Sequence, residues 1–162
     1  MINERIPVWV KASVAQHFDA IATGTFPMYL EGVAPRETEK IETGFFELRL
    51  DGPYFTQISR DYWSCYVEIN VLIQEPITMK DDRQVYQIDA NAGKIAVAFT
   101  DIIIKKFGDE AGDDETVFGC MHLLQDVRDR QRIQINHFGQ IEPKVRVQQA
   151  TVEGHYNMEI DT

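Results

Sequence analysis

Residues 62–74 read YWSCYVEINVLIQ and hold the clearest periodic pattern in the sequence. Its odd positions are apolar through six consecutive alternations, and polar side chains occupy most of the even positions; the apolar set is Trp63, Cys65, Val67, Ile69, Val71 and Ile73. A period of two places this set on one face of a β-strand. Tyr66 and Leu72 indicate that the opposite face is also partly covered. The pattern therefore predicts a long strand with one buried face, which ends at Pro76.

The chain before this strand predicts one helix and three shorter strands. Apolar residues recur every third or fourth position over residues 8–22, as on one face of a helix. The strands are predicted over residues 26–30, 44–50 and 54–59, with a turn at Asp51-Gly52-Pro53 joining the last two. The polar residues 31–43 between the first two strands predict an exposed connection.

The chain after the long strand predicts a second helix and two more strands. The helix covers about residues 88–107, with Asp89 as its N-cap and Gly108 as its stop. Strands follow over 117–138 and 145–160, and a change in the parity of apolar positions in the last strand predicts a β-bulge near Gln148-Gln149. The prediction is a single α+β domain over residues 1–162, with two main helices packed on a mostly antiparallel sheet. The predicted order is α-β-β-β-β-α-β-β.

Composition excludes several classes of protein. The 162 residues are 44% hydrophobic and 26% charged, which is typical of a folded domain and not of a disordered chain. A net charge of −10 argues against binding a polyanion over the whole surface. No apolar run approaches the roughly 20 residues that span a bilayer, and MINERIPVWV does not resemble a secretory signal, so we expect no membrane partner. Both cysteines, Cys65 and Cys120, are predicted to be buried free thiols.

Residues that carry catalysis or bind metals show no recognisable spacing. The histidines, which are His17, His122, His137 and His155, fall in different predicted elements with no H-x-H or H-x-x-x-H pair. Nucleotide-binding and acyl-transfer motifs do not occur. We therefore predict no catalytic residue, no metal ligand and no cofactor, and no enzymatic activity. An enzymatic or small-ligand-binding α+β domain remains the competing class.

Two charged segments predict a subunit interface. Arginines at a spacing of two would line one face of a strand, namely Arg128, Arg130 and Arg132. A separate acidic loop contains Asp109, Glu110, Asp113, Asp114 and Glu115. Opposite patches on one molecule suit head-to-tail association into a closed ring, although a solvated loop and ordinary surface ion pairs explain the same charges. Trp63, in an aromatic-rich hairpin, is a further candidate anchor for a partner.

The order of the elements resembles that of a known family. The sequence passes from a helix and a short strand (FPMYLEG) through a hairpin into VEINVLIQ, then a helix (DANAGKIAVAFTDIIIKKFG) and a strand pair ending QQATVEGHYNMEI. Over nearly its whole length it is similar to the tail terminator (tail completion) proteins of long-tailed bacteriophages. The stretches GPYFTQISRDYWSCYVEINVLIQEP and VRVQQATVEGHYNMEI also resemble phage neck and tail-completion sequences. The connection 31–43 and the acidic loop are less typical of that family.

The resemblance implies a structural virion protein with no catalytic residues. Such a protein forms a homo-hexameric ring that caps the tail tube, ends its polymerisation and joins it to the head-tail connector or a neck protein. Genomic DNA passes through the ring without sequence-specific binding. The implied location is the tail or neck of the virion, after assembly in the host cytoplasm. A neck stopper, a tail-tube protein or a minor tail protein is the alternative within the same structural class.

Overall fold

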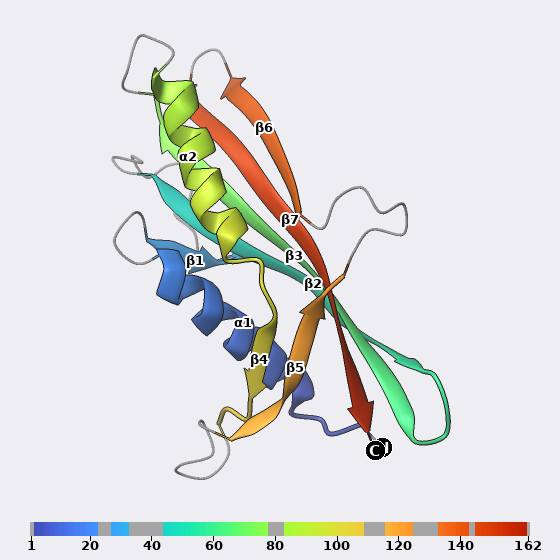
Figure 1. Cartoon of the computed structure of the whole chain (residues 1–162). Helices are drawn as coiled ribbons and strands as arrows, with labels where there is room; N and C mark the ends of the chain where they lie inside the picture. Colours follow the sequence, from blue (N-terminus) through green and yellow to red (C-terminus); the bar gives the residue numbers. More distant parts are fainter. Residues whose placement is uncertain are drawn as a thin grey trace.

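The computed structural model describes residues 2–22, 27–32, 44–77, 83–108, 116–124, 133–142 and 145–161, and it contains two helices and seven strands (Figure 1). In chain order these are α1 (Ile6–Ala22), β1 (Met28–Leu30), β2 (Phe45–Gln57), β3 (Tyr62–Pro76), α2 (Arg83–Val97), β4 (Ile102–Lys105), β5 (Val117–Leu123), β6 (Ile133–Glu142) and β7 (Val145–Asp161). Within these residues, neither helix has the length and apolar character that a membrane crossing requires.

The strands form one twisted, mixed sheet that forks along β7. The main path is β1-β2-β3-β7-β5-β4, and β6 pairs with β7 outside this path. Only β1 and β2 are parallel among the described pairs, and the others are antiparallel. One side of β7 pairs with the whole length of β3, from Val147 to Asp161. Its other side pairs first with β6 and then, from Tyr156, with β5. The sheet therefore has two branches beyond β7 (Figure 1).

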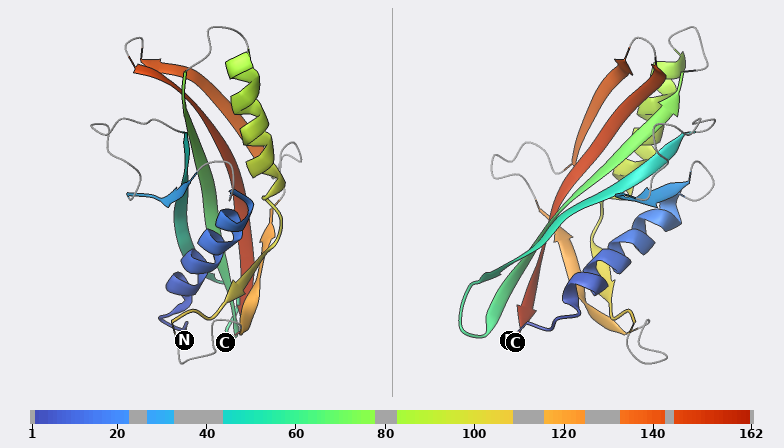
Figure 2. Two further views of the ribbon diagram at one scale, coloured as in Figure 1. Left: turned by 90° about the vertical axis from the view of Figure 1, so that its left-hand side faces the viewer. Right: turned by 180° about the vertical axis from the view of Figure 1, so that it is seen from behind.

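Both helices cover the same face of the sheet and form the core with it. The predicted buried face of β3 is confirmed from Cys65 to Ile73, where all five odd-numbered side chains are at most 1% exposed. Phe18 of α1 and Ile88 of α2 pack against this face in one hydrophobic cluster. Figure 2 (right) shows the opposite side, where β2, β3 and β7 lie in front of both helices. The sheet thus has one helix-covered face and one open face.

Helix α1 also closes the edge of the sheet at β4. The Ser13 hydroxyl accepts a hydrogen bond from the Lys105 backbone N–H at 2.8 Å. The Trp9 indole N–H donates to the Phe107 carbonyl at 2.9 Å, and an Arg5 guanidinium nitrogen donates to the Gly108 carbonyl at 2.8 Å. Because these side chains bond backbone groups of residues 105–108, this edge is protected from pairing with another strand.

The predicted order of the elements is wrong. The structure has α-β-β-β-α-β-β-β-β, with three strands before the second helix and four after it. The two strands predicted over 44–50 and 54–59 are a single strand, β2, and residues 102–105, predicted as the end of a helix, form β4. The strand predicted over 117–138 is represented by β5 and β6, between which residues 125–132 lie outside the described part. The first helix, predicted over 8–22, is confirmed as α1.

The second helix begins five residues earlier and ends ten residues earlier than the predicted 88–107, so Asp89 lies inside it and is not its N-cap. It ends at Val97, where the Ala98 and Phe99 N–H groups bond the carbonyls three residues back, at Ile95 and Ala96. Residues 102–105 then form β4, in which burial alternates. A run of three β-branched isoleucines favours a strand over a helix, because the branched side chain is restricted against the preceding helical turn. The assignment of Lys105 and Lys106 to a last helical turn is accordingly wrong.

The turn predicted at Asp51-Gly52-Pro53 is a bulge within β2. Asp51 lies opposite Glu68 and Tyr54 opposite Tyr66, so β2 has one extra residue there. Gly52 has a φ of +110°, and the Gly52-Pro53 peptide bond is cis. A Cβ at position 52 would lie 2.8 Å from the Tyr66 carbonyl oxygen. Only glycine satisfies both the backbone conformation and the close approach.

The bulge predicted near Gln148-Gln149 is absent from the pairing of β7 with β3. The β3–β7 register runs without a shift from Pro76↔Val147 to Tyr62↔Asp161. The change of parity in the sequence arises because a polar residue, Gln148, occupies a buried position of β7, opposite the buried Glu75. The irregularities lie in the pairing of β7 with β6, whose register shifts between His137 and Gly139 and again between Gln140 and Glu142. The first shift gives β6 an extra residue and the second gives β7 one, on either side of Gln148-Gln149.

Replacing Gly52 with alanine is expected to lower the free energy of unfolding by about 1–3 kcal/mol, since the left-handed backbone conformation and the Tyr66 carbonyl both oppose a Cβ. Urea denaturation measures the change. Gly93→Ala is the matched control, because no atom lies within 4 Å of a Cβ at position 93 of α2 and alanine favours the helix. Equal stability of the two variants would contradict the assigned role of Gly52.

Candidate functional site

The charged segments predicted to form an interface lie outside the described residues. These are Arg128, Arg130 and Arg132, and the acidic residues Asp109, Glu110, Asp113, Asp114 and Glu115. Trp63 is described: it lies in β3 opposite Gln57 and Ile160, half-buried and packed against the core. Its role as an anchor for a partner stays a prediction, and part of its side chain packs against the core close to the tip of the β2–β3 hairpin.

The tip of the β2–β3 hairpin extends away from the helices and exposes apolar side chains. Figure 2 (right) shows this projection. The loop Ile58–Asp61 joins the strands, and the Ile58 and Ser59 N–H groups donate to the Tyr62 carbonyl at 3.0 and 3.2 Å. Tyr54, Ile58 and Tyr62 are all exposed. A projecting hairpin with exposed aromatic residues is suited to contact a neighbouring molecule.

The free edge of β6 is a second exposed apolar region. In the described part of the chain, β6 pairs with β7 alone, so the backbone groups on its other side have no strand partner there. Ile135 is 48% exposed and Phe138 is 59% exposed. Phe138 is the extra residue of the bulge between His137 and Gly139. We refer to this region, residues 133–138 of β6, as the β6 edge. Unlike the edge at β4, its regular part before the bulge, residues 133–137, has the properties of a template for strand addition.

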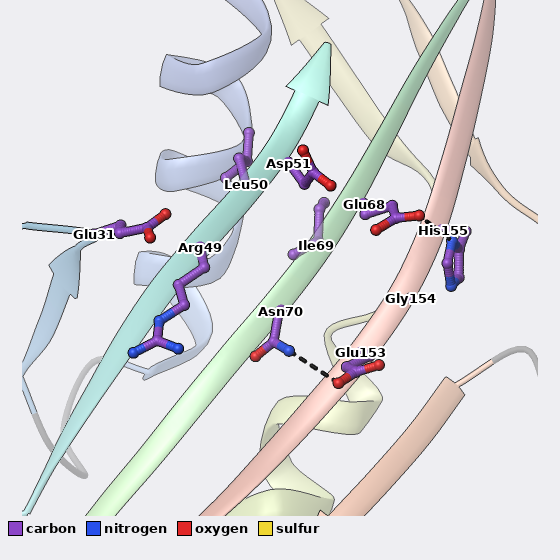
Figure 3. Close-up of a pocket in the computed structure, with 10 residues that line it drawn as sticks. All are labelled: Glu31, Arg49, Leu50, Asp51, Glu68, Ile69, Asn70, Glu153, Gly154 and His155. Carbon is purple, nitrogen blue, oxygen red and sulfur yellow. Dashed lines mark hydrogen bonds and ion pairs between the residues drawn. The ribbon is translucent and has the colours of Figure 1, made fainter. Parts of the chain in front are cut away.

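The open face of the sheet forms a shallow, acidic groove over β2, β3 and β7. A hollow of about 300 Å³ lies there, and its lining includes the carboxylates of Glu31, Asp51, Glu68 and Glu153, as Figure 3 shows. The Asn70 amide donates to Glu153 Oε1 at 3.0 Å, so that β3 and β7 are linked across the groove. Arg49 contributes a positive charge, and its Nε lies 2.6 Å from Glu47 Oε1.

Polar side chains of the open face form a connected cluster around Glu68. The Tyr66 hydroxyl donates to Glu68 Oε1 at 2.9 Å and also bonds His155 Nδ1. His155 Nδ1 lies 3.5 Å from Glu68 Oε1. Burial, then the hydrogen bond to Glu68 and the charges of Glu68 and Asp51, raise the pKa of Tyr66 to about 12. The tyrosine thus stays protonated in this negative environment.

Both cysteines are free, but only Cys65 matches the prediction of a buried thiol. Burial raises the pKa of Cys65 to about 11, as expected for an inert core thiol. Cys120 is half-buried and lies beside Asp101 and His122. Sequence reasoning missed this group because Asp101 is distant in the chain, although the pair Cys120-x-His122 places two potential ligands on one face of a strand.

Comparison with known proteins establishes the fold alone. No protein-family model matches the chain, and no curated protein matches its sequence. A solved structure matches with a TM-score of 0.53 over 96% of this chain and 97% of its own, at 12% sequence identity. At that identity the likeness extends to the arrangement of helices and strands and not to activity.

Proposed function

We propose that this chain is a structural virion protein: a subunit of a homo-hexameric ring that caps the phage tail tube, ends its polymerisation and joins the tail to the head-side connector. Tail tube protein and the connector or a neck protein are its proposed partners, and genomic DNA passes through the ring. The proposal starts from the resemblance to tail terminator proteins and rests structurally on the β6 edge.

The β6 edge supports the proposal because it suits pairing between copies. Exposed strand edges are normally short, charged or covered, since they otherwise promote association. In this chain α1 covers the edge at β4, whereas the β6 edge, residues 133–138, has no strand partner among the described residues and exposes Ile135 and Phe138. An edge of this length, occupied by another copy in the assembled state, is consistent with a ring subunit.

The acidic open face is compatible with the passage of DNA. The four carboxylates that line the hollow outnumber Arg49 and His155, so this surface repels phosphate groups. A ring through which DNA slides functions best when it does not bind the phosphate backbone, because each neutralised phosphate adds salt-dependent affinity that impedes movement.

Two alternatives have specific support. A neck stopper, tail-tube protein or minor tail protein would use the same edge for ring formation; cross-linking in virions distinguishes them, because a terminator contacts tube protein on one side and a connector on the other. A small-ligand-binding or enzymatic domain is favoured by the groove that brings His155, Glu68 and Tyr66 together. A small molecule that co-purifies with the chain in this groove would favour that alternative.

The experiment that tests the proposal measures assembly directly. Light scattering over a range of concentrations gives the mass of the purified chain, and binding to purified tail tubes is followed by negative-stain microscopy. We expect six-fold rings, either in solution or on tube ends, and shorter tubes when the chain is present during polymerisation. A monomer at high concentration that also fails to bind tubes would overturn the proposal.

A further inference from the structure

Three potential metal ligands meet on the exposed face of the β4–β5 hairpin. Ile102 pairs with Met121, and Met121 and Leu123 point into the core. Residues 120 and 122 alternate with them and therefore lie on the opposite face of β5. Asp101 directly precedes β4, and continuation of the register places it opposite His122. The topology thus brings a carboxylate, a thiol and an imidazole together.

The distances between these groups are close to those of a tetrahedral metal site. One ligand atom of each of Asp101, Cys120 and His122 lies within 4.8 Å of the other two, and Asp101 Oδ2 is 3.1 Å from His122 Nδ1. Ligand bonds of the lengths found around Zn²⁺ require donor atoms about 3.4–3.6 Å apart. Rotation of side chains is sufficient to reach this spacing, because all three residues are at least partly exposed.

The carboxylate of Asp101 is already oriented by the backbone. Its Oδ1 accepts a hydrogen bond from the Leu123 N–H at 3.2 Å, and its Oδ2 faces His122. A hydrogen bond to the second oxygen of a ligating carboxylate is a usual outer contact of metal sites, where it fixes the ligand in position. In Asp101, the backbone therefore holds Oδ1 in place, and Oδ2 remains directed at the other ligands of the group.

We propose that Asp101, Cys120 and His122 bind one Zn²⁺ per chain, with the fourth coordination position open to water. A set of one sulfur, one nitrogen and one oxygen donor suits this ion, whereas Mg²⁺ and Ca²⁺ require six or more oxygen ligands. Binding replaces the Asp101–His122 contact, and the Cys120 thiol releases its proton to solvent as the zinc–sulfur bond forms. The site is independent of ring formation.

An ion pair between Asp101 and His122 is the competing explanation, and Cys120 distinguishes the two. An ion pair assigns no role to the thiol, whereas a zinc site requires it. Substitutions at all three positions affect exposed or half-buried side chains, and Asp101→Asn keeps an oxygen for the Leu123 N–H. The variants are therefore expected to fold.

Zinc titration of the full chain by calorimetry tests the proposal, with Co²⁺ as a spectroscopic probe. We expect one Zn²⁺ per chain and at least about tenfold weaker binding in each of Asp101→Asn, Cys120→Ser and His122→Gln, because loss of even an outer contact costs 10–100-fold. Cys120→Ser should also abolish the thiolate-to-Co²⁺ charge-transfer band. His155→Gln removes another histidine beside a carboxylate and is expected to bind Zn²⁺ like the wild type. Absence of binding, or binding unaffected by Cys120→Ser, would overturn the assignment.

Discussion

Replacing Gly154 with valine is expected to destabilise the fold by about 3 kcal/mol. Gly154 is buried in β7 at the fork of the sheet, opposite Ile69 of β3 and Ile133 of β6. A Cβ at this position would lie 2.5 Å from Phe99 Cδ1 and 3.2 Å from Leu123 Cδ1. The Phe99 ring has little room to move, because it is 3% exposed and packed between two other aromatic rings, those of Phe18 and Tyr156. Overpacking of this kind typically costs 1–3 kcal/mol.

Chemical denaturation of Gly154→Val measures this cost, and the matched pair Gly154→Ala and Gly119→Ala tests its cause. A Cβ at position 119 would also be crowded, at 2.7 Å, but by the sulfur of Met158, an unbranched side chain that can adjust. Gly119→Ala should therefore change stability much less. Replacing Phe99 with the smaller leucine in the Gly154→Ala variant should recover part of the stability that the glycine substitution removes. If both glycine variants proved equally stable, the close packing of Phe99 on the sheet would not be the reason for glycine at 154.

The sequence predicts those parts of the fold in which one periodicity is unambiguous. The alternation from Trp63 to Ile73 identifies β3 and its buried face, and the spacing of Val10, Val14 and Phe18 identifies α1. The region from Phe99 to Phe107 fits a helical stripe equally well, and a strand forms there because β5 pairs with it and α1 bonds its backbone. Contacts so distant in the chain are invisible to a local pattern.

The candidate surfaces depend on topology in the same way. Ile133 and Ile135 predict a strand, but the sequence does not show where it lies in the sheet. It can form the edge beside β7 because β5 pairs only with the C-terminal part of β7. His122 and Asp101 are 21 residues apart and meet only because β4 and β5 pair. Local pattern thus identifies candidate side chains, and long-range strand pairing determines which of them lie together.

Substituting lysine for both Ile135 and Phe138 is expected to weaken self-association about 100-fold. The loss of two apolar contacts at an interface costs about 1–2 kcal/mol each, which together correspond to roughly this factor. Lysine on an edge strand also opposes the approach of a second strand. Folding should be unaffected, since the two side chains are 48% and 59% exposed in the free chain. Sedimentation equilibrium and capping of tail tubes measure the effect.

The control for this pair is Val8→Lys with Val97→Lys, which adds the same two charges to helices α1 and α2. These valines are 51% and 76% exposed, so the control removes comparable apolar surface away from the β6 edge. If solubility or net charge governed association, both double variants would dissociate alike. If the subunits pair through the β6 edge, only the variant with lysine at Ile135 and Phe138 dissociates. If that variant assembles like the wild type, the β6 edge is not the contact between subunits.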